Sequence, residues 1–232
     1  FYGEGLDGLM RARSGDLRGI VNGIDYDVFN PETDPDIVQN YYAKNFRKEK
    51  VKNKRALQEE LGLAKDDKKF MIGIVSRLTN QKGLDLIQCV MDEICTDDVQ
   101  LVVLGTGDEN YENMFRHYDW KYHDRVSAQI YYSEPLSHKI YAACDAFLMP
   151  SLFEPCGLSQ LMALRYGTVP IVRETGGLKD TVWPYNEFEG TGTGFSFANY
   201  NAHEMLNIIR YAKHIYYDKK REWSKIVDRA MA

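Results

Sequence analysis

The sequence has no apolar run near the roughly 20 residues that span a bilayer, and its first residues lack the basic start and apolar core of a signal peptide. It has no excess of positive charge either, because its net charge is −5 at pH 7. A general affinity for nucleic acid or anionic membrane is therefore not expected. Four cysteines occur, none in a CxxC pair or at zinc-ligand spacing. These absences favour a cytoplasmic globular protein that binds any anion locally.

A hydrophobic content of 44% is ample for a packed core. Short apolar runs alternate with segments of helical spacing from residue 70 onwards. The runs predict buried strands at 70–76, 99–105, 127–132, 146–151 and 168–173. Strict alternation of strand and helix indicates right-handed crossovers and a parallel sheet covered by helices. The sequence therefore predicts a doubly wound, Rossmann-like α/β fold, whose ligands bind beyond the carboxyl ends of the strands.

The region before residue 70 follows a different pattern. Residues 1–24 are rich in glycine and predict a connecting segment, and residues 25–232 then form the folded domain. Because the chain starts with Phe, we expect a piece of a longer protein. Residues 44–55 carry seven cations, which could bind a polyanion, although their helical spacing favours a solvated helix face.

The loop after the first strand, "SRLTNQKG", holds two cations. Arg77 stands at the strand exit and Lys82 near the start of the next helix. A guanidinium fork and an ammonium beside a helix start suit a diphosphate, and such a site could dispense with a metal. The loop is no Walker motif, and two solvated cations are an equally good interpretation from spacing alone.

The next two loops carry weaker signals. Gly105 and Gly107 in "GTGD" permit close approach of a ligand, but the rest of a dinucleotide fingerprint is missing, and a tight turn capped by Asp108 explains them equally. Tyr132 could stack on a base, although a packing role is favoured. His138 is expected on a helix surface.

The loops after the fourth and fifth strands offer further anion-binding geometry. Glu154 precedes a helix predicted from about Leu158, where the acid could cap the helix or hold sugar hydroxyls while the amides hold a phosphate. Cys156 is more typical of packing than of nucleophilic catalysis. Thr175, Gly176 and Gly177 can present a nest of amides. Three such loops on one rim predict a shared site.

These motifs also carry a family resemblance. "SRLTNQKG", "LGTGD", "SLFEPCGLSQLMALRYGTVPIV" and "TGGLKDTV", preceded by "GIVNGIDYDVFNPETD", resemble the C-terminal half of bacterial glycogen synthases and plant starch synthases over roughly residues 3 to 213. The resemblance implies a retaining glycosyltransferase of the two-domain GT-B type. Residues 1–24 would be the interdomain linker and tail of an N-terminal domain, and residues 25–232 the C-terminal domain that binds the nucleotide sugar.

The resemblance also implies roles for single residues. Arg77 and Lys82 would hold the diphosphate of ADP-glucose, and Glu154 would position the glucosyl unit and support an oxocarbenium-like transition state. Tyr132 would stack on adenine and Asn22 would lie near the glucose. The remaining implied substrate-binding positions are Cys156, Gly157, Leu158, Ser159, Thr175, Gly176, Gly177, Gly105 and Gly107. No metal or other cofactor is implied.

The implied partners are ADP-glucose or ADP, an α-1,4-glucan acceptor and the N-terminal domain of the same protein. Met162 stands where many related retaining transferases have a second Glu, which favours the glycogen synthase branch. The alternatives are a UDP-glucose-dependent transferase, a nicotinamide-dependent oxidoreductase on a similar sheet, and a non-catalytic binding domain. Without the N-terminal domain, weak nucleotide binding and little polymerisation are expected.

Overall fold

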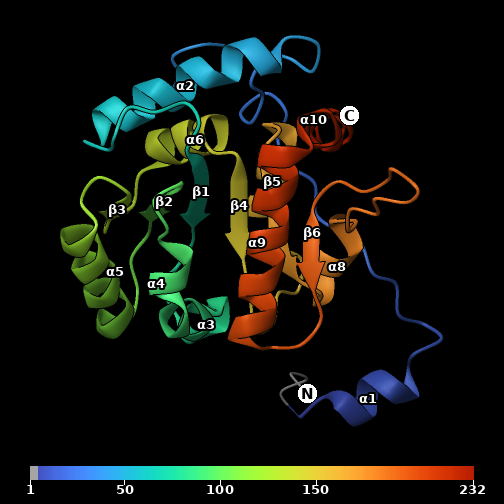
Figure 1. Cartoon of the computed structure of the whole chain (residues 1–232). Coiled ribbons are helices and arrows are strands. Elements are labelled where there is room, and N and C mark those ends of the chain that lie inside the picture. Colours follow the sequence, from blue (N-terminus) through green and yellow to red (C-terminus); the bar gives the residue numbers. More distant parts are fainter. Residues whose placement is uncertain (1–4) are drawn as a thin grey trace.

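The computed structural model describes residues 5–232, which form a six-stranded parallel sheet with helices on both faces (Figure 1). The strand order is β3-β2-β1-β4-β5-β6, and every neighbouring pair is parallel. The strands are β1 (Phe70–Val75), β2 (Val99–Leu104), β3 (Val126–Gln129), β4 (Ala146–Met149), β5 (Val169–Arg173) and β6 (Phe195–Phe197). The predicted doubly wound α/β fold is thereby confirmed.

The helices fill the connections between these strands. They are α1 (Asp7–Ala12), α2 (Phe46–Glu60), the 3-10 turn η1 (Asn80–Lys82), α3 (Leu84–Cys89), α4 (Met91–Ile94), α5 (Glu109–Lys121), α6 (Glu134–Ala143), α7 (Ser159–Arg165), α8 (Gly176–Thr181), α9 (Ala202–Asp218) and α10 (Lys220–Ala230). Four of the five predicted strands begin and end within about two residues of the observed strands. The strand expected at 127–132 ends at Gln129, and β6 was not predicted.

Alternate residues of the central strand β1 face opposite layers of helices. Phe70, Ile72 and Ile74 belong to the larger core cluster, which includes residues of α3, α4, α9 and α10. Met71 belongs to a second cluster with residues of α2 and α6. The period of two along a strand explains this division, and burial on both faces explains the near-continuous apolar runs.

The order of the strands fixes where a ligand can enter. The chain builds outward from β1 through β2 to β3 and then crosses back to β4, which pairs with the other side of β1. The loops after β1 and β4 therefore leave the same edge of the sheet side by side, and the chain continues from them to β2 on one side and to β5 on the other. This topological switch point is the crevice where doubly wound folds bind ligands.

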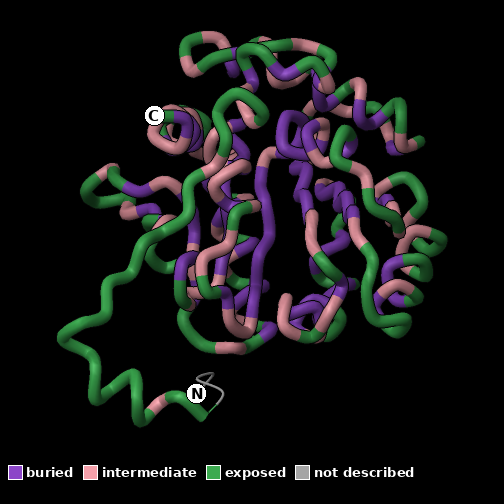
Figure 2. The backbone as a smooth tube through the Cα atoms, turned by 180° about the vertical axis from the view of Figure 1, so that it is seen from behind, coloured by how far each residue is buried: buried purple, intermediate pink, exposed green. Residues whose placement is uncertain are grey.

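The described part of the N-terminal segment, residues 5–23, is almost entirely exposed and extends away from the sheet (Figure 2). It includes α1, which has no buried residue. Residues 1–4 of the predicted linker lie outside the described residues. In the part of the chain that is described, no helix has the length and apolarity required to cross a membrane.

The cation-rich stretch of residues 44–55 lies on α2, but two of its lysines face inward. Lys54 is 2% exposed and pairs with Asp145, with Nζ and Oδ2 2.6 Å apart. Lys50 is partly buried, and its ammonium donates to Tyr141 O and Ala142 O, at the end of α6. The expected solvated face is thus only part of the helix.

Candidate functional site at the carboxyl edge of the sheet

An ion pair joins the two loops that open at the switch point. Lys82, the last residue of η1, lies with Nζ 2.6 Å from Oε2 of Glu154, in the loop after β4. The Ser151 hydroxyl lies 3.3 Å from the same carboxylate oxygen. The two ionised side chains are largely buried, with 16% and 9% of their surfaces exposed. A basic group and an acid separated by 72 residues along the chain therefore share one site.

Backbone contacts fix the position of this pair. Leu152 N donates to Gln81 O at 2.9 Å, and the Gln81 amide donates to Phe153 O at 3.3 Å. Arg173, at the end of β5, donates to Leu152 O at 2.7 Å. Because the two residues before Glu154 are held by these contacts, the loop presents its side chain to Lys82 in a defined place.

The loop after β5 packs on the Glu154 loop at backbone distance. Gly177 N donates to Glu154 O at 3.0 Å. A Cβ atom at Gly176 would lie 2.1 Å from Glu154 O, and one at Gly177 would lie 2.1 Å from Cys156 O. Thr175 is the N-cap residue of α8. The two glycines therefore allow the third loop to reach the site, as only residues without a side chain can.

The loop from Cys156 to Leu158 leads into α7, which begins at Ser159. Leu158 is the N-cap residue, and no side chain caps the helix. The Gln160 amide donates to Cys156 O at 2.9 Å and to Gly157 O at 3.2 Å. From the N-terminal segment, Asn22 N lies 3.4 Å from Cys156 Sγ. The structure thus places the exposed segment in contact with this loop.

Two of the predicted residues lie on the rim and make no side-chain bond that would fix them. Arg77 lies two residues after the end of β1 and is exposed. Tyr132 follows β3, two strands away from β1, and is 85% exposed. Both side chains are free to meet a ligand that lies over the edge of the sheet.

The glycines of "GTGD" have a packing role. A Cβ at Gly105 would lie 1.8 Å from Ser76 O, and one at Gly107 would lie 2.3 Å from Leu78 O. The loop after β2 therefore abuts the loop after β1 through its backbone. Asp108 is the N-cap residue of α5, but its side chain makes no capping bond.

Arg173 and Gln160 were not predicted from the sequence. Arg173 donates to backbone carbonyls after β4, and Gln160 binds those at the start of α7. The sequence did offer one signal for Arg173: it is a cation on the last residue of a strand that ends near the switch point. Gln160 is fully buried yet lies on a helix without any distinguishing motif. Both side chains hold the backbone of the loops that form the site.

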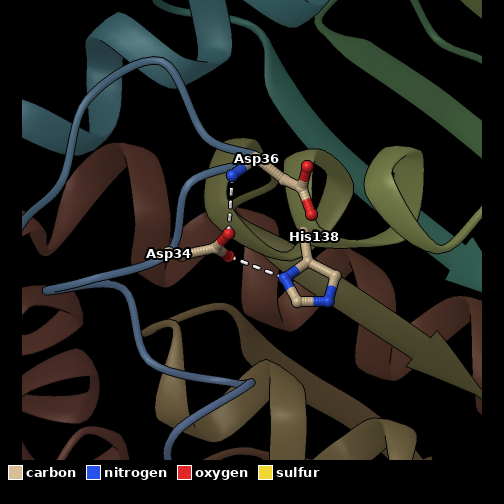
Figure 3. Close-up of side chains that lie close together, drawn as sticks. All are labelled: Asp34, Asp36 and His138. Atoms are coloured by element: carbon tan, nitrogen blue, oxygen red, sulfur yellow. Dashed lines mark hydrogen bonds and ion pairs between the residues drawn. The ribbon is translucent and has the colours of Figure 1, made fainter.

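His138 is buried and ion-paired, so its expected place on a helix surface is wrong (Figure 3). Its Nδ1 lies 2.7 Å from Asp34 Oδ2, Phe29 stacks on its ring with centroids 4.7 Å apart, and the Tyr166 hydroxyl also donates to Asp34. Asp36 N donates to Asp34 Oδ1 at 2.8 Å. The sequence did not indicate that this face of α6 is buried, because the partner of His138, Asp34, lies 104 residues away along the chain.

Charge and burial act in opposite directions in this cluster. Burial raises the pKa of Asp34, but hydrogen bonds with His138 and Tyr166 lower it more, so the net shift is downward. Burial lowers the pKa of His138, but the hydrogen bond and charge of Asp34 raise it more. Asp34 Oδ2 already accepts from both His138 Nδ1 and the Tyr166 hydroxyl, so neither Oδ2 nor Nδ1 presents a free lone pair to a metal ion. The cluster is a clamp that fastens the segment around Asp34 to α6.

Comparison with known proteins identifies the family. The pattern described as Glycosyl transferases group 1 matches residues 57–227. The chain belongs to this family. It is 78% identical over 231 residues to the glycogen synthase of Lachnospira eligens and 76% identical over 232 residues to that of Lachnoclostridium phytofermentans. In both cases the match covers 100% of this chain and 48% of the relative.

A solved structure agrees with these relatives. The catalytic domain of Starch Synthase IV from Arabidopsis thaliana, bound to ADP and acarbose, superposes with a TM-score of 0.92 and is 35% identical. The match covers 99% of this chain and 48% of that one. The chain thus spans about half the length of the relatives it matches, and its resemblance to the glycogen and starch synthase family is confirmed.

Proposed function

We propose that the chain is the nucleotide-sugar-binding part of a glycogen synthase, which transfers glucose from ADP-glucose to the non-reducing end of an α-1,4-glucan with retention of configuration. The observation that carries the proposal is the Lys82–Glu154 pair at the switch point, with Nζ and Oε2 2.6 Å apart. Doubly wound sheets bind ligands at this crevice. The family match and the named relatives, which are glycogen synthases, support the choice of reaction.

The cations would act on the leaving group. When the bond between the anomeric carbon and the phosphate oxygen breaks, negative charge develops on the diphosphate. Lys82, inside the crevice, and Arg77, on its rim, would stabilise that charge, together with the uncapped amides before α7. Side-chain cations and amides can do this without a metal ion, so we expect a reaction that needs no cofactor.

Glu154 would act on the sugar. Its carboxylate is held by Lys82 and Ser151, and its backbone oxygen accepts from Gly177. A fixed carboxylate can orient sugar hydroxyls and favour positive charge on the glucosyl ring as the bond to the nucleotide weakens. Asn22, beside Cys156, would lie near the same sugar, and Tyr132 would stack on the base.

We expect the glucan acceptor to require the N-terminal domain of a GT-B enzyme. The relatives are about twice the length of this chain, and exposed apolar side chains such as Leu9 and Ile20 mark the N-terminal segment as a contact surface.

The four cysteines of the chain are free thiols, which fits the reducing environment of the cytoplasm. We propose ADP-glucose rather than UDP-glucose as the donor, because the similar starch synthase structure has ADP bound.

An oxidoreductase that uses a nicotinamide cofactor fits less well. The strand order is the same as in dinucleotide-binding folds, so the fold alone does not decide between the two reactions. The glycines of "GTGD" pack against the backbone of the loop after β1, so close packing explains them without a pyrophosphate. The loop after β1 has two cations in place of a glycine-rich fingerprint.

The test compares two variants of the full-length protein. Glu154→Gln keeps the shape of the side chain and removes its charge, and we expect glucan synthesis from ADP-glucose to fall by about 100-fold or more. Lys82→Ala should also weaken the binding of ADP, measured by calorimetry. Undiminished synthesis by Glu154→Gln, or unchanged ADP affinity in Lys82→Ala, would refute the proposal. A parallel assay with UDP-glucose decides the donor.

A further inference from the structure

A cavity of about 410 Å³ lies at the other edge of the sheet. Its walls come from α2, the end of α9, α10 and the residues that precede three strands. Asp145 stands directly before β4 and Lys68 shortly before β1, so the cavity is at the amino ends of the strands. Lys82 and Glu154 follow the carboxyl ends of the same strands. The cavity is therefore separate from the proposed donor site.

The charges around the cavity are unbalanced. Five cations line it, Arg47, Lys50, Lys54, Lys68 and Lys220, against the two acids Asp67 and Asp145. Both acids are already paired, Asp67 with Arg55 and Asp145 with Lys54. Within residues 5–232, no carboxylate lies within ion-pair distance of Lys50, Lys68 or Lys220. Arg47 is paired as well, with Asp228. Lys68 and Lys220 therefore bring unpaired positive charge to this hollow, although the chain has a net charge of −5.

In the described part of the chain, the ammonium of Lys50 is held by neutral acceptors and by no carboxylate at ion-pair distance. It donates to Ala142 O at 2.7 Å, to Tyr141 O at 3.0 Å and to Thr168 Oγ1 at 2.8 Å. These acceptors are dipoles and carry no full charge. Desolvation lowers the pKa of Lys50 to about 7. The charge of Asp145 opposes this shift only in part, so an anion in the cavity would further favour the charged form of Lys50.

The remaining walls are mainly aromatic. Phe46 of α2, Tyr216 and Tyr217 of α9 and Trp223 of α10 line the cavity. Tyr216 and Trp223 pack edge to face with centroids 5.3 Å apart. Aromatic walls bind flat apolar groups, and pockets for small molecules combine such walls with a few polar groups that fix the orientation.

We propose that this cavity binds a small organic anion with a flat apolar body. Its acid group lies near Lys68 and Lys220, which are exposed at the mouth, and its ring lies between α2 and α10. A phosphate ester and a carboxylate satisfy the same charges. Such a ligand binds on the side of the sheet away from Lys82 and Glu154, so it and the nucleotide can be bound at the same time.

The experiment uses three probes that share one ring: 1-naphthyl phosphate, 1-naphthoate and 1-naphthol. Calorimetry on the full-length protein, saturated with ADP to occupy the donor site, measures their affinities. We expect at least one anion to bind about tenfold or more tightly than naphthol, and the better anion separates phosphate from carboxylate chemistry. The double variant Lys68→Ala/Lys220→Ala should remove most of that advantage.

A matched variant controls for overall charge. Lys44→Ala/Lys48→Ala removes two exposed cations that do not line the cavity and should leave anion binding unchanged. Ser224→Trp fills the cavity and should abolish binding, with circular dichroism and the unfolding midpoint as checks on folding. Equal affinity for naphthol and both anions, equal effects of the two double variants, or undiminished binding by folded Ser224→Trp would each overturn the proposal.

Discussion

His138 couples the stability of the fold to pH. Its pKa is raised in the folded protein, so the stabilisation it provides is fully present below its unfolded value near 6.5 and is lost as pH rises through the folded pKa. The pKa of Asp34 is lowered, so its contribution is present above its unfolded value near 3.8 and is lost as pH falls through the folded pKa. The clamp is therefore strongest between these two unfolded values.

We predict that His138→Gln lowers the free energy of unfolding by about 1–3 kcal/mol near pH 6, because a buried hydrogen bond to a charged group is lost. The difference from the unmodified protein should shrink as pH rises above the folded pKa of His138. Urea unfolding from about pH 5 to about pH 9 measures it. His214→Gln is the control, since His214 also bonds an aspartate but is exposed. A constant difference across this range would contradict the prediction.

The same residue shows what limits inference from sequence. Lys82 and Glu154 were placed together because each follows a parallel strand, and the carboxyl ends of such strands meet at one edge. His138 lies in the middle of α6, where no comparable rule names the partner. The burial of a polar side chain depends on which distant segment packs over it. For His138 that segment is the irregular chain around Asp34.

At the scale of elements, the glycines at the start of α8 decide how closely three loops can meet. We predict that Gly177→Ala lowers the free energy of unfolding by about 1–3 kcal/mol, because the new methyl group must displace the backbone at Cys156. It should also weaken ADP binding, since that backbone leads into α7. Urea unfolding and calorimetry measure the two effects.

Gly8→Ala is the matched control. Gly8 lies on the exposed helix α1, and nothing stands within 4 Å of a Cβ added there. This substitution should leave stability unchanged or raise it slightly, because alanine favours a helix. If Gly177→Ala behaves like Gly8→Ala, the close packing of the loops does not constrain the site.

Elements with long, uniform patterns were predicted well, and short or mixed ones were not. The runs of β1, β2, β4 and β5 are nearly all apolar because both faces are covered. β6 was not predicted because it has three residues and alternates buried and half-buried positions at the edge of the sheet. On α2, the cations and their helical spacing predicted a solvated face, whereas the long stems of Lys50 and Lys54 allow their ammonium groups to reach inward.

At the scale of the whole molecule, the proposed function predicts that this chain alone, residues 1–232, elongates no glucan. The donor site is formed within the chain, but the acceptor surface is expected on the N-terminal domain. A glucosyl transfer assay with ADP-glucose, run beside the full-length protein, tests this, and calorimetry should show weaker ADP binding by the chain alone. Elongation at the rate of the full-length protein would show that the acceptor site lies within these residues.

The two edges of the sheet have different charge arrangements. At the carboxyl edge, Lys82 is matched by Glu154 within a crevice formed by backbone contacts. At the amino edge, Lys68 and Lys220 line a hollow whose two acids, Asp67 and Asp145, are paired with other cations. The two sites are linked through β4, which begins after Asp145 and leads to the Glu154 loop.

In the crevice, the charges of Lys82 and Glu154 balance each other before any ligand enters. If the proposed function holds, an arriving diphosphate must compete with the Glu154 carboxylate for the Lys82 ammonium. Binding of the donor then exchanges one negative partner of Lys82 for another. Glu154, held by the contacts of its loop, would keep its place while the Lys82 ammonium turns toward the phosphate. The carboxylate oxygen that Lys82 leaves could then accept hydrogen bonds from sugar hydroxyls.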